Sequence, residues 1–207
     1  MTNSVVPIGL VYEDPLCETL LYKILSETRT SLQPYNCAGG GGYQYIKKHI
    51  NGFNTAAQGC PYLVLVDLEA TCPSAQIQEW LCSPRHPNLL LRIAVRESEA
   101  WVMADYHGFT RFLGIRESTI PSNVDTIPDP KAFLIELARR SRNRRLREDL
   151  VPRANSTAKV GPDYNGRLSQ FINTTWDIGK ARQHSRSLDR AVIAIQQFKP
   201  IFQHGYP

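Results

Sequence analysis

The stretch Tyr62–Glu69, which reads Y-L-V-L-V-D-L-E, constrains the fold more than any other part of the chain. A short run of leucine and valine that follows a Gly-Cys-Pro turn signal predicts a strand buried on both faces. The strand ends in Asp67 and Glu69, and residues two apart on an extended chain point the same way. Because like charges repel, we expect a divalent cation or a basic side chain between or opposite them. The alternative is that Asp67 caps the next helix and Glu69 is solvated.

Two further predicted strands, Val5–Tyr12 and Leu89–Val95, also run into acidic residues. A helix is expected from about Leu16 to Ser26, directly after the first of these strands. The nearby carboxylates are Glu13, Asp14 and, in that helix, Glu18, together with Glu97 and Glu99 after the later strand.

Strands that alternate with helices predict an α/β fold with a mostly parallel sheet and right-handed crossovers. The C-terminal ends of such strands meet at one edge of the sheet, where ligands usually bind. Several carboxylates gathered there need cations to stay ionised, and oxygen ligands without His or Cys suit Mg²⁺ or Mn²⁺. Metal ions held in this way stabilise the transition states of phosphoryl transfer.

The second half of the chain is basic and is expected to be helical. Residues 1–103 carry 7 Lys and Arg against 9 Asp and Glu, whereas residues 104–207 carry 17 against 10. We expect an α/β core over residues 1–116 and a basic helical region over residues 117–207 that packs on it. An acidic half joined to a basic half is a reasonable pattern for a metal site beside a surface that binds a polyanion.

An arginine-rich segment, A-R-R-S-R-N-R-R-L-R-E, is expected to continue a helix that begins at Pro130. Guanidinium groups suit phosphate, although cations near a helix C-terminus are also commonly just solvated. The basic residues that we select as nucleic-acid contacts are Arg142, Arg144 and Arg145, with Lys159 of the polar loop 156–162 and Lys47 and Lys48 of an earlier helix.

That earlier helix, Tyr43–Ile50, follows four glycines at positions 39–42. A glycine run before a helix can bring backbone N–H groups close to a phosphate, and a flexible loop is the alternative. The run matches neither of the common nucleotide-binding motifs.

Two amphipathic helices, Tyr164–Thr175 and Ser187–Phe198, are predicted to pack on the core. Large aromatic side chains are expected in the core rather than as platforms for nucleic-acid bases. These aromatic residues are Trp101, Phe109, Phe112, Phe171 and Trp176.

Other features narrow the class of protein. The five cysteines form no C-x-x-C pair and the histidines form no H-x-x-x-H pair, which argues against a disulfide framework and a zinc site. No apolar run is long enough to span a bilayer and no signal peptide pattern opens the sequence, so we expect a cytoplasmic protein without membrane contact.

Six stretches together carry a resemblance to a known group. A strand ending in Glu, a helix, and then a strand ending in D-x-[DE] resemble the Toprim domain of topoisomerases, primases and OLD-type nucleases. Most of the chain is similar to the Toprim-like bacterial family called domain of unknown function 4276. The stretches are V-Y-E-D-P-L-C-E (11–18), L-V-L-V-D-L-E (63–69), R-I-A-V-R-E-S-E-A-W-V-M-A-D (92–105), D-P-K (129–131), S-T-A-K-V-G-P (156–162) and S-R-S-L (185–188).

The resemblance implies a Toprim-like (Rossmann-like) fold and a Mg²⁺- or Mn²⁺-dependent nuclease that cleaves DNA or RNA. It implies Glu13 as general acid/base and Asp67 and Glu69 as metal ligands. We extend the ligand set to Glu97 and Glu99 and include Asp14 and Glu18 as further candidates. Asp14 stands where the family usually has Gly, and could add a ligand or crowd the site. Glu69 stands where the family usually has Asp.

The resemblance also implies a setting in phage defence, beside an ATPase partner, and a homodimer is compatible with it. Two alternatives stay open from the residues. One is a non-catalytic subunit that binds nucleic acid or a partner protein. The other is an enzyme that binds or transfers nucleotides through the glycine run.

Overall fold

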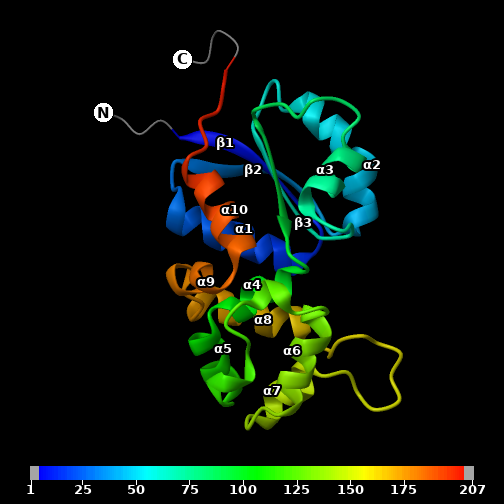
Figure 1. Cartoon of the computed structure of the whole chain (residues 1–207), viewed down its shortest axis with the longest axis vertical. Coiled ribbons are helices and arrows are strands. Elements are labelled where there is room, and N and C mark those ends of the chain that lie inside the picture. Colours follow the sequence, from blue (N-terminus) through cyan, green and yellow to red (C-terminus); the bar gives the residue numbers. More distant parts are fainter. Residues whose placement is uncertain (1–4, 203–207) are drawn as a thin grey trace. The chain divides into compact units, whose positions relative to one another are not determined.

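The computed structural model describes residues 5–202 and divides the chain into two compact units (Figure 1). The first unit combines the chain up to Val95 with the chain from Arg190 onward, and the second is Arg96–Asp189. The sequence analysis divided the chain after residue 116, whereas the structure divides it at Val95 and again at Asp189.

The first unit is built on a four-stranded, all-parallel sheet in the order β2-β1-β3-β4. Parallel strands need crossover connections, and a helix follows each of the first three strands. The α/β class is therefore confirmed. The elements are β1 (Val6–Tyr12), α1 (Pro15–Thr28), β2 (Leu32–Gly39), α2 (Gly42–Ala56), β3 (Tyr62–Asp67), α3 (Pro73–Trp80) and β4 (Leu89–Ala94).

The strand order reverses its direction at β1, which lies between β2 and β3. Right-handed crossovers in this order put α1 on one face of the sheet and α2 and α3 on the other. Such a reversal opens a crevice at the carboxyl ends of the two central strands, which is where open α/β sheets bind ligands. Tyr12 of β1 is paired with Leu65 of β3. The residues just beyond β1 and those at the end of β3 therefore lie next to each other at this edge of the sheet.

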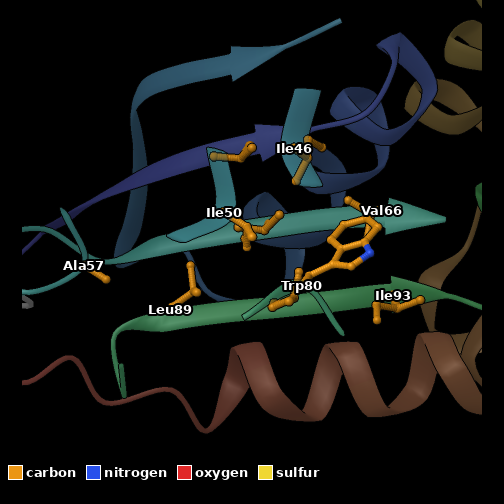
Figure 2. Close-up of a cluster of buried hydrophobic side chains, with 10 residues drawn as sticks. Ile46, Ile50, Ala57, Val66, Trp80, Leu89 and Ile93 are labelled. Atoms are coloured by element: carbon orange, nitrogen blue, oxygen red, sulfur yellow. The ribbon is translucent and has the colours of Figure 1, made fainter. Parts of the chain in front are cut away.

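The face that α2 and α3 cover is a continuous apolar core (Figure 2). Alternate residues of the strands point into it, because side chains on a strand alternate between faces. Trp80 at the end of α3 fills the space between helix and sheet and is 3 % exposed. The other members are Val11, Ile46, Ile50, Ala57, Val64, Val66, Leu89, Leu91 and Ile93. This packing fixes the strand ends that carry the acidic residues.

The second unit is helical. Its indole groups lie at the centre, since Trp176 Nε1 donates to the Trp101 carbonyl at 3.1 Å and Trp101 Nε1 donates to Ser187 Oγ at 2.7 Å. Of the five aromatic residues expected in the core, four are fully buried and Phe112 is half-buried. The helices are α4 (Ser98–Ala104), α5 (Tyr106–Leu113), α6 (Pro130–Arg139), α7 (Arg144–Leu150), α8 (Tyr164–Thr174) and α9 (Ile178–His184), while α10 (Arg186–Gln196) spans the division between the units.

The arginine-rich segment is not one continuous helix, so that prediction is wrong. Helix α6 ends at Arg139 and α7 begins at Arg144. The Asn143 side chain accepts hydrogen bonds from the N–H groups of Arg145 and Leu146, and buried Ser141 donates to the Leu113 carbonyl. A capped helix start between the two arginine groups therefore replaces the continuous helix.

Helices α5 and α9 were not predicted. Asp105 separates α5 from α4, because it is the C-cap of α4 and its buried carboxylate accepts from Gly108 N–H at the start of α5. Within residues 5–202, no helix is both long and apolar enough to cross a membrane.

Candidate active site

Two of the predicted site residues, Glu13 and Asp67, meet at the carboxyl edge of the sheet. Glu13 directly follows β1 and Asp67 is the last residue of β3, its neighbour in the sheet. The backbone N–H of Asp67 donates to Glu13 Oε2 at 3.1 Å. Asp67 is only 6 % exposed, whereas Glu13 is half-buried. The site thus combines a largely buried acidic residue with one that solvent can reach.

The loop after β3 is held by Gln76 of α3, which the sequence analysis did not select. Its side-chain oxygen accepts from the N–H groups of Glu69 at 2.6 Å and Ala70 at 3.2 Å, and its amide donates to the Asp67 carbonyl at 2.9 Å. Gln76 is fully buried. A buried glutamine with three hydrogen bonds to one loop fixes the path of the chain immediately beyond Asp67.

Glu69 lies on that loop and its side chain is exposed. It is therefore near Asp67 along the chain but less enclosed than Asp67. The predicted D-x-E pair thus ends up with one member buried at the strand end and the other on the solvent side.

Asp14 and Glu18 both serve the start of α1. The Asp14 carboxylate accepts from Cys17 N–H at 2.8 Å and caps the helix. Glu18 accepts from the Tyr12 hydroxyl at 2.7 Å. Burial of Tyr12 and its hydrogen bond to Glu18 raise the pKa of the phenol to about 12. Both carboxylates therefore accept hydrogen bonds within the chain, at the edge of the sheet where Glu13 lies.

The glycine run also reaches this edge. Gly42 N–H donates to the Glu13 carbonyl at 3.2 Å, and Gly42 has a positive φ of 69° that other residues rarely adopt. A Cβ on Gly39 would lie 2.0 Å from the Tyr12 ring. These glycines are therefore required by backbone shape and close packing. In the helix they precede, Lys47 forms an ion pair with Glu79 at 2.6 Å and Lys48 is exposed.

Glu97 and Glu99 belong to the second unit. Glu97 Oε2 accepts from the backbone N–H of Lys131 at 2.8 Å. Glu99 is fully buried, accepts from the Tyr164 hydroxyl at 3.1 Å and lies 3.3 Å from Lys131 Nζ. These contacts join α4 to α6 and α8 and link the R-E-S-E and D-P-K stretches. The metal role expected for Glu97 and Glu99 stays a prediction.

The other four predicted basic contacts are in the second unit and differ in their surroundings. Arg144 pairs with Glu148 at 2.7 Å and Arg145 approaches Asp149 at 4.0 Å. Arg142 and Lys159 are exposed. Arg144 and Arg145 are thus partly neutralised by neighbours on their own helix.

The metal prediction can be compared with this geometry. Among residues 5–202, no group of three or more His, Cys, Asp and Glu side chains is arranged to hold one ion. Mg²⁺ is usually held by only one or two carboxylates, with water and substrate phosphates as its other ligands. The carboxylate oxygens of Asp67 and Glu69 are donors of the type that this chemistry needs.

Comparison with known proteins identified no relative of this chain. A scan against protein-family models, a search of curated proteins and a search of solved structures each found no match. The Toprim-like resemblance therefore stays a prediction.

Proposed function

We propose that the chain is a Toprim-like, Mg²⁺- or Mn²⁺-dependent nuclease that hydrolyses phosphodiesters of DNA or RNA. The observation that supports it is the meeting of Glu13 and Asp67 within one hydrogen bond, where the strand order of a parallel sheet reverses. Two acidic residues at the ends of neighbouring strands beside such a crevice suit both proton transfer and cation binding.

In this proposal, Glu13 is the proton carrier because its carboxylate is the more accessible of the two. Glu13 accepts a proton from the attacking water as the water oxygen bonds to phosphorus. The phosphorus–oxygen bond to the leaving alcohol breaks, and Glu13 returns the proton to that oxygen. Asp67, with Glu69 on the adjoining loop, would hold the metal ion. The ion would polarise the phosphoryl oxygens and lower the pKa of a bound water.

The test is cleavage of plasmid DNA and total tRNA by the purified chain in Mg²⁺ or Mn²⁺, beside an EDTA control. Glu13→Gln should reduce the cleavage rate about 100-fold or more. Glu27→Gln removes the same charge from an exposed position on α1 and should leave the rate unchanged. Cleavage that survives EDTA or Glu13→Gln would overturn the proposal.

A second candidate function is a non-catalytic subunit that binds nucleic acid, in phage defence beside an ATPase. It is favoured by the contacts of buried Glu99 with Lys131 and Tyr164. A carboxylate that already has these partners is less available to bind a metal ion. This function predicts nucleic-acid binding that is insensitive to EDTA and to Glu13→Gln and that falls steeply with salt.

A further inference from the structure

A cavity of about 710 Å³ lies in the second unit, between the end of α6, helix α7 and the loop that follows α7. Arg139, Arg147 and Arg153 line it, together with Glu148 and Asp149. None of these three arginines was among the nucleic-acid contacts selected from the sequence. The cavity is of the size that holds a drug-sized ligand, which is larger than one phosphate group requires.

The two carboxylates of the lining are engaged by arginines outside it. Glu148 pairs with Arg144 at 2.7 Å, and Asp149 pairs with Arg167 at 2.7 Å. Their negative charge is therefore largely compensated before any ligand is considered.

The three lining arginines are in different situations. Arg139 pairs with exposed Glu136 at 3.0 Å, and Arg147 donates to the Ser141 carbonyl, which accepts without neutralising its charge. Within residues 5–202, the Arg153 side chain has no hydrogen bond or ion pair, and it is exposed. The cavity thus presents an excess of positive charge, and at least one guanidinium fork has all its donors available.

The wall that carries Arg153 is fixed at both ends. Gly161 N–H donates to the Leu150 carbonyl at 3.0 Å, and Asp163 N–H donates to the Asp149 carbonyl at 3.0 Å. A Cβ on Gly161 would lie 2.3 Å from the Asp149 carbonyl oxygen, so only glycine allows this approach. The loop therefore returns to the end of α7, and the cavity wall has a defined base.

We propose that this cavity binds the sugar-phosphate backbone of a nucleic acid through Arg139, Arg147 and Arg153. The proposal rests on the nucleic-acid substrate of the proposed function, and it assigns the backbone contact to residues other than Arg144 and Arg145, which do not line the cavity. Guanidinium groups bind phosphate oxygens in a bidentate manner, and several of them on one wall suit a chain of phosphates better than a single anion.

The test is binding of fluorescent single-stranded DNA and RNA oligonucleotides to the full chain in EDTA, over a range of salt concentrations. The triple variant R139Q/R147Q/R153Q should bind at least about tenfold more weakly. Its slope of log affinity against log salt should be shallower by about 2, because each phosphate contact on a single strand contributes about 0.7. Arg116→Gln, at an exposed position of the same unit, is the matched control and should change affinity less than about twofold.

Arg147 also holds the turn at Ser141, so the triple variant is first checked by circular dichroism. If it does not fold, Arg153→Gln carries the test, because no partner within the chain is lost. It should bind about threefold more weakly, with a slope shallower by about 0.7.

Three results would overturn the proposal. They are equal binding by the arginine variants and the Arg116→Gln control, no binding by the natural chain at low salt, and displacement of the oligonucleotide by low millimolar inorganic phosphate at constant ionic strength. Because binding is measured in EDTA, the outcome is separate from that of the nuclease proposal. Binding that depends on the arginines, without cleavage, would support the cavity as the binding site and contradict the nuclease proposal. Cleavage together with unchanged binding in the variants would support the nuclease proposal and contradict the cavity as the binding site.

Discussion

The backbone N–H of Asp67 donates a hydrogen bond to Glu13 Oε2 at 3.1 Å across 54 residues of sequence. Because the donor is a backbone group, the contact does not depend on the charge of the Asp67 side chain. Substitution of Asp67 therefore tests the metal site without removing the hydrogen bond that positions Glu13.

Asp67→Asn should keep the fold and lose the response to metal. A ligand that binds only the native state raises the unfolding temperature, so Mg²⁺ or Mn²⁺ should stabilise the natural chain and not the variant. Differential scanning fluorimetry with and without the ions measures the shift. Glu69→Gln should retain part of the shift because Glu69 is exposed on the loop beyond the strand. An equal metal-induced shift in Asp67→Asn and the natural chain would contradict the assignment.

Gln76→Ala should destabilise the chain by about 2–4 kcal/mol. The substitution leaves the buried Asp67 carbonyl without its donor, and a buried unsatisfied group costs about 1–3 kcal/mol. The N–H groups of Glu69 and Ala70 lose their acceptor too, but water can reach them in part, so they add less. Urea denaturation measures the change. Gln78→Ala on the exposed side of the same helix should change stability by less than about 0.5 kcal/mol. Similar effects of the two substitutions would show that Gln76 does not hold the loop.

Glu99→Gln tests whether the buried carboxylate is structural. Removal of the Glu99 charge should cost about 2 kcal/mol, because it leaves the Lys131 ammonium without its partner, and that ammonium is in part reached by water. The same loss is expected in EDTA and in Mg²⁺. Glu117→Gln, which removes an exposed partner of His107, is the control and should cost less than about 1 kcal/mol. A loss of stability seen only in Mg²⁺ would instead identify Glu99 as a metal ligand.

The parallel arrangement of the strands and the meeting of Glu13 with Asp67 at one edge follow from features that the sequence displays, whereas the strand order comes from the structure. Short apolar runs predict parallel strands, and parallel strands bring their carboxyl ends to one edge. The loop geometry beyond Asp67 could not be predicted in the same way. It depends on Gln76, a polar residue on the buried face of a helix, and only the packed structure shows what it contacts.

The second unit shows the same limit. Glu99 is 32 positions from Lys131 and 65 from Tyr164, and nothing in the local pattern relates the three. A signal for the break between α6 and α7 was present, because Asn143 is a favoured helix cap, but the density of arginines favoured one helix. Long-range pairing and capping thus account for what the sequence analysis missed.

Alkaline pH should weaken the first unit through Tyr12. Burial and the Glu18 hydrogen bond raise the pKa of Tyr12 to about 12, from 10.0 for an unperturbed phenol. A group whose pKa is higher in the folded state stabilises fully below its unfolded pKa, and this contribution disappears as pH rises through the folded pKa. Stability should therefore fall between about pH 10 and pH 12. Unfolding by urea at several pH values should give a shallower fall for Tyr12→Phe, and an unchanged slope would contradict the role of Tyr12.

Arg92→Met should stabilise the chain, unlike most substitutions at a half-buried position. Arg92 lies on the outer strand β4 beside Leu65, and it has no hydrogen bond or ion pair within residues 5–202. Burial lowers the pKa of its guanidinium, and the charges of Arg85 and Arg190 lower it further. Methionine keeps the apolar stem and removes the unpaired charge, so the free energy of unfolding should rise by about 1 kcal/mol.

Arg85→Met, at an exposed position, is the control and should change the free energy of unfolding by less than about 0.5 kcal/mol. Added salt should narrow the difference between Arg92→Met and the natural chain, because it screens the repulsion among the arginines. A loss of stability in Arg92→Met at all salt concentrations would mean that the Arg92 charge is favourable in the folded protein.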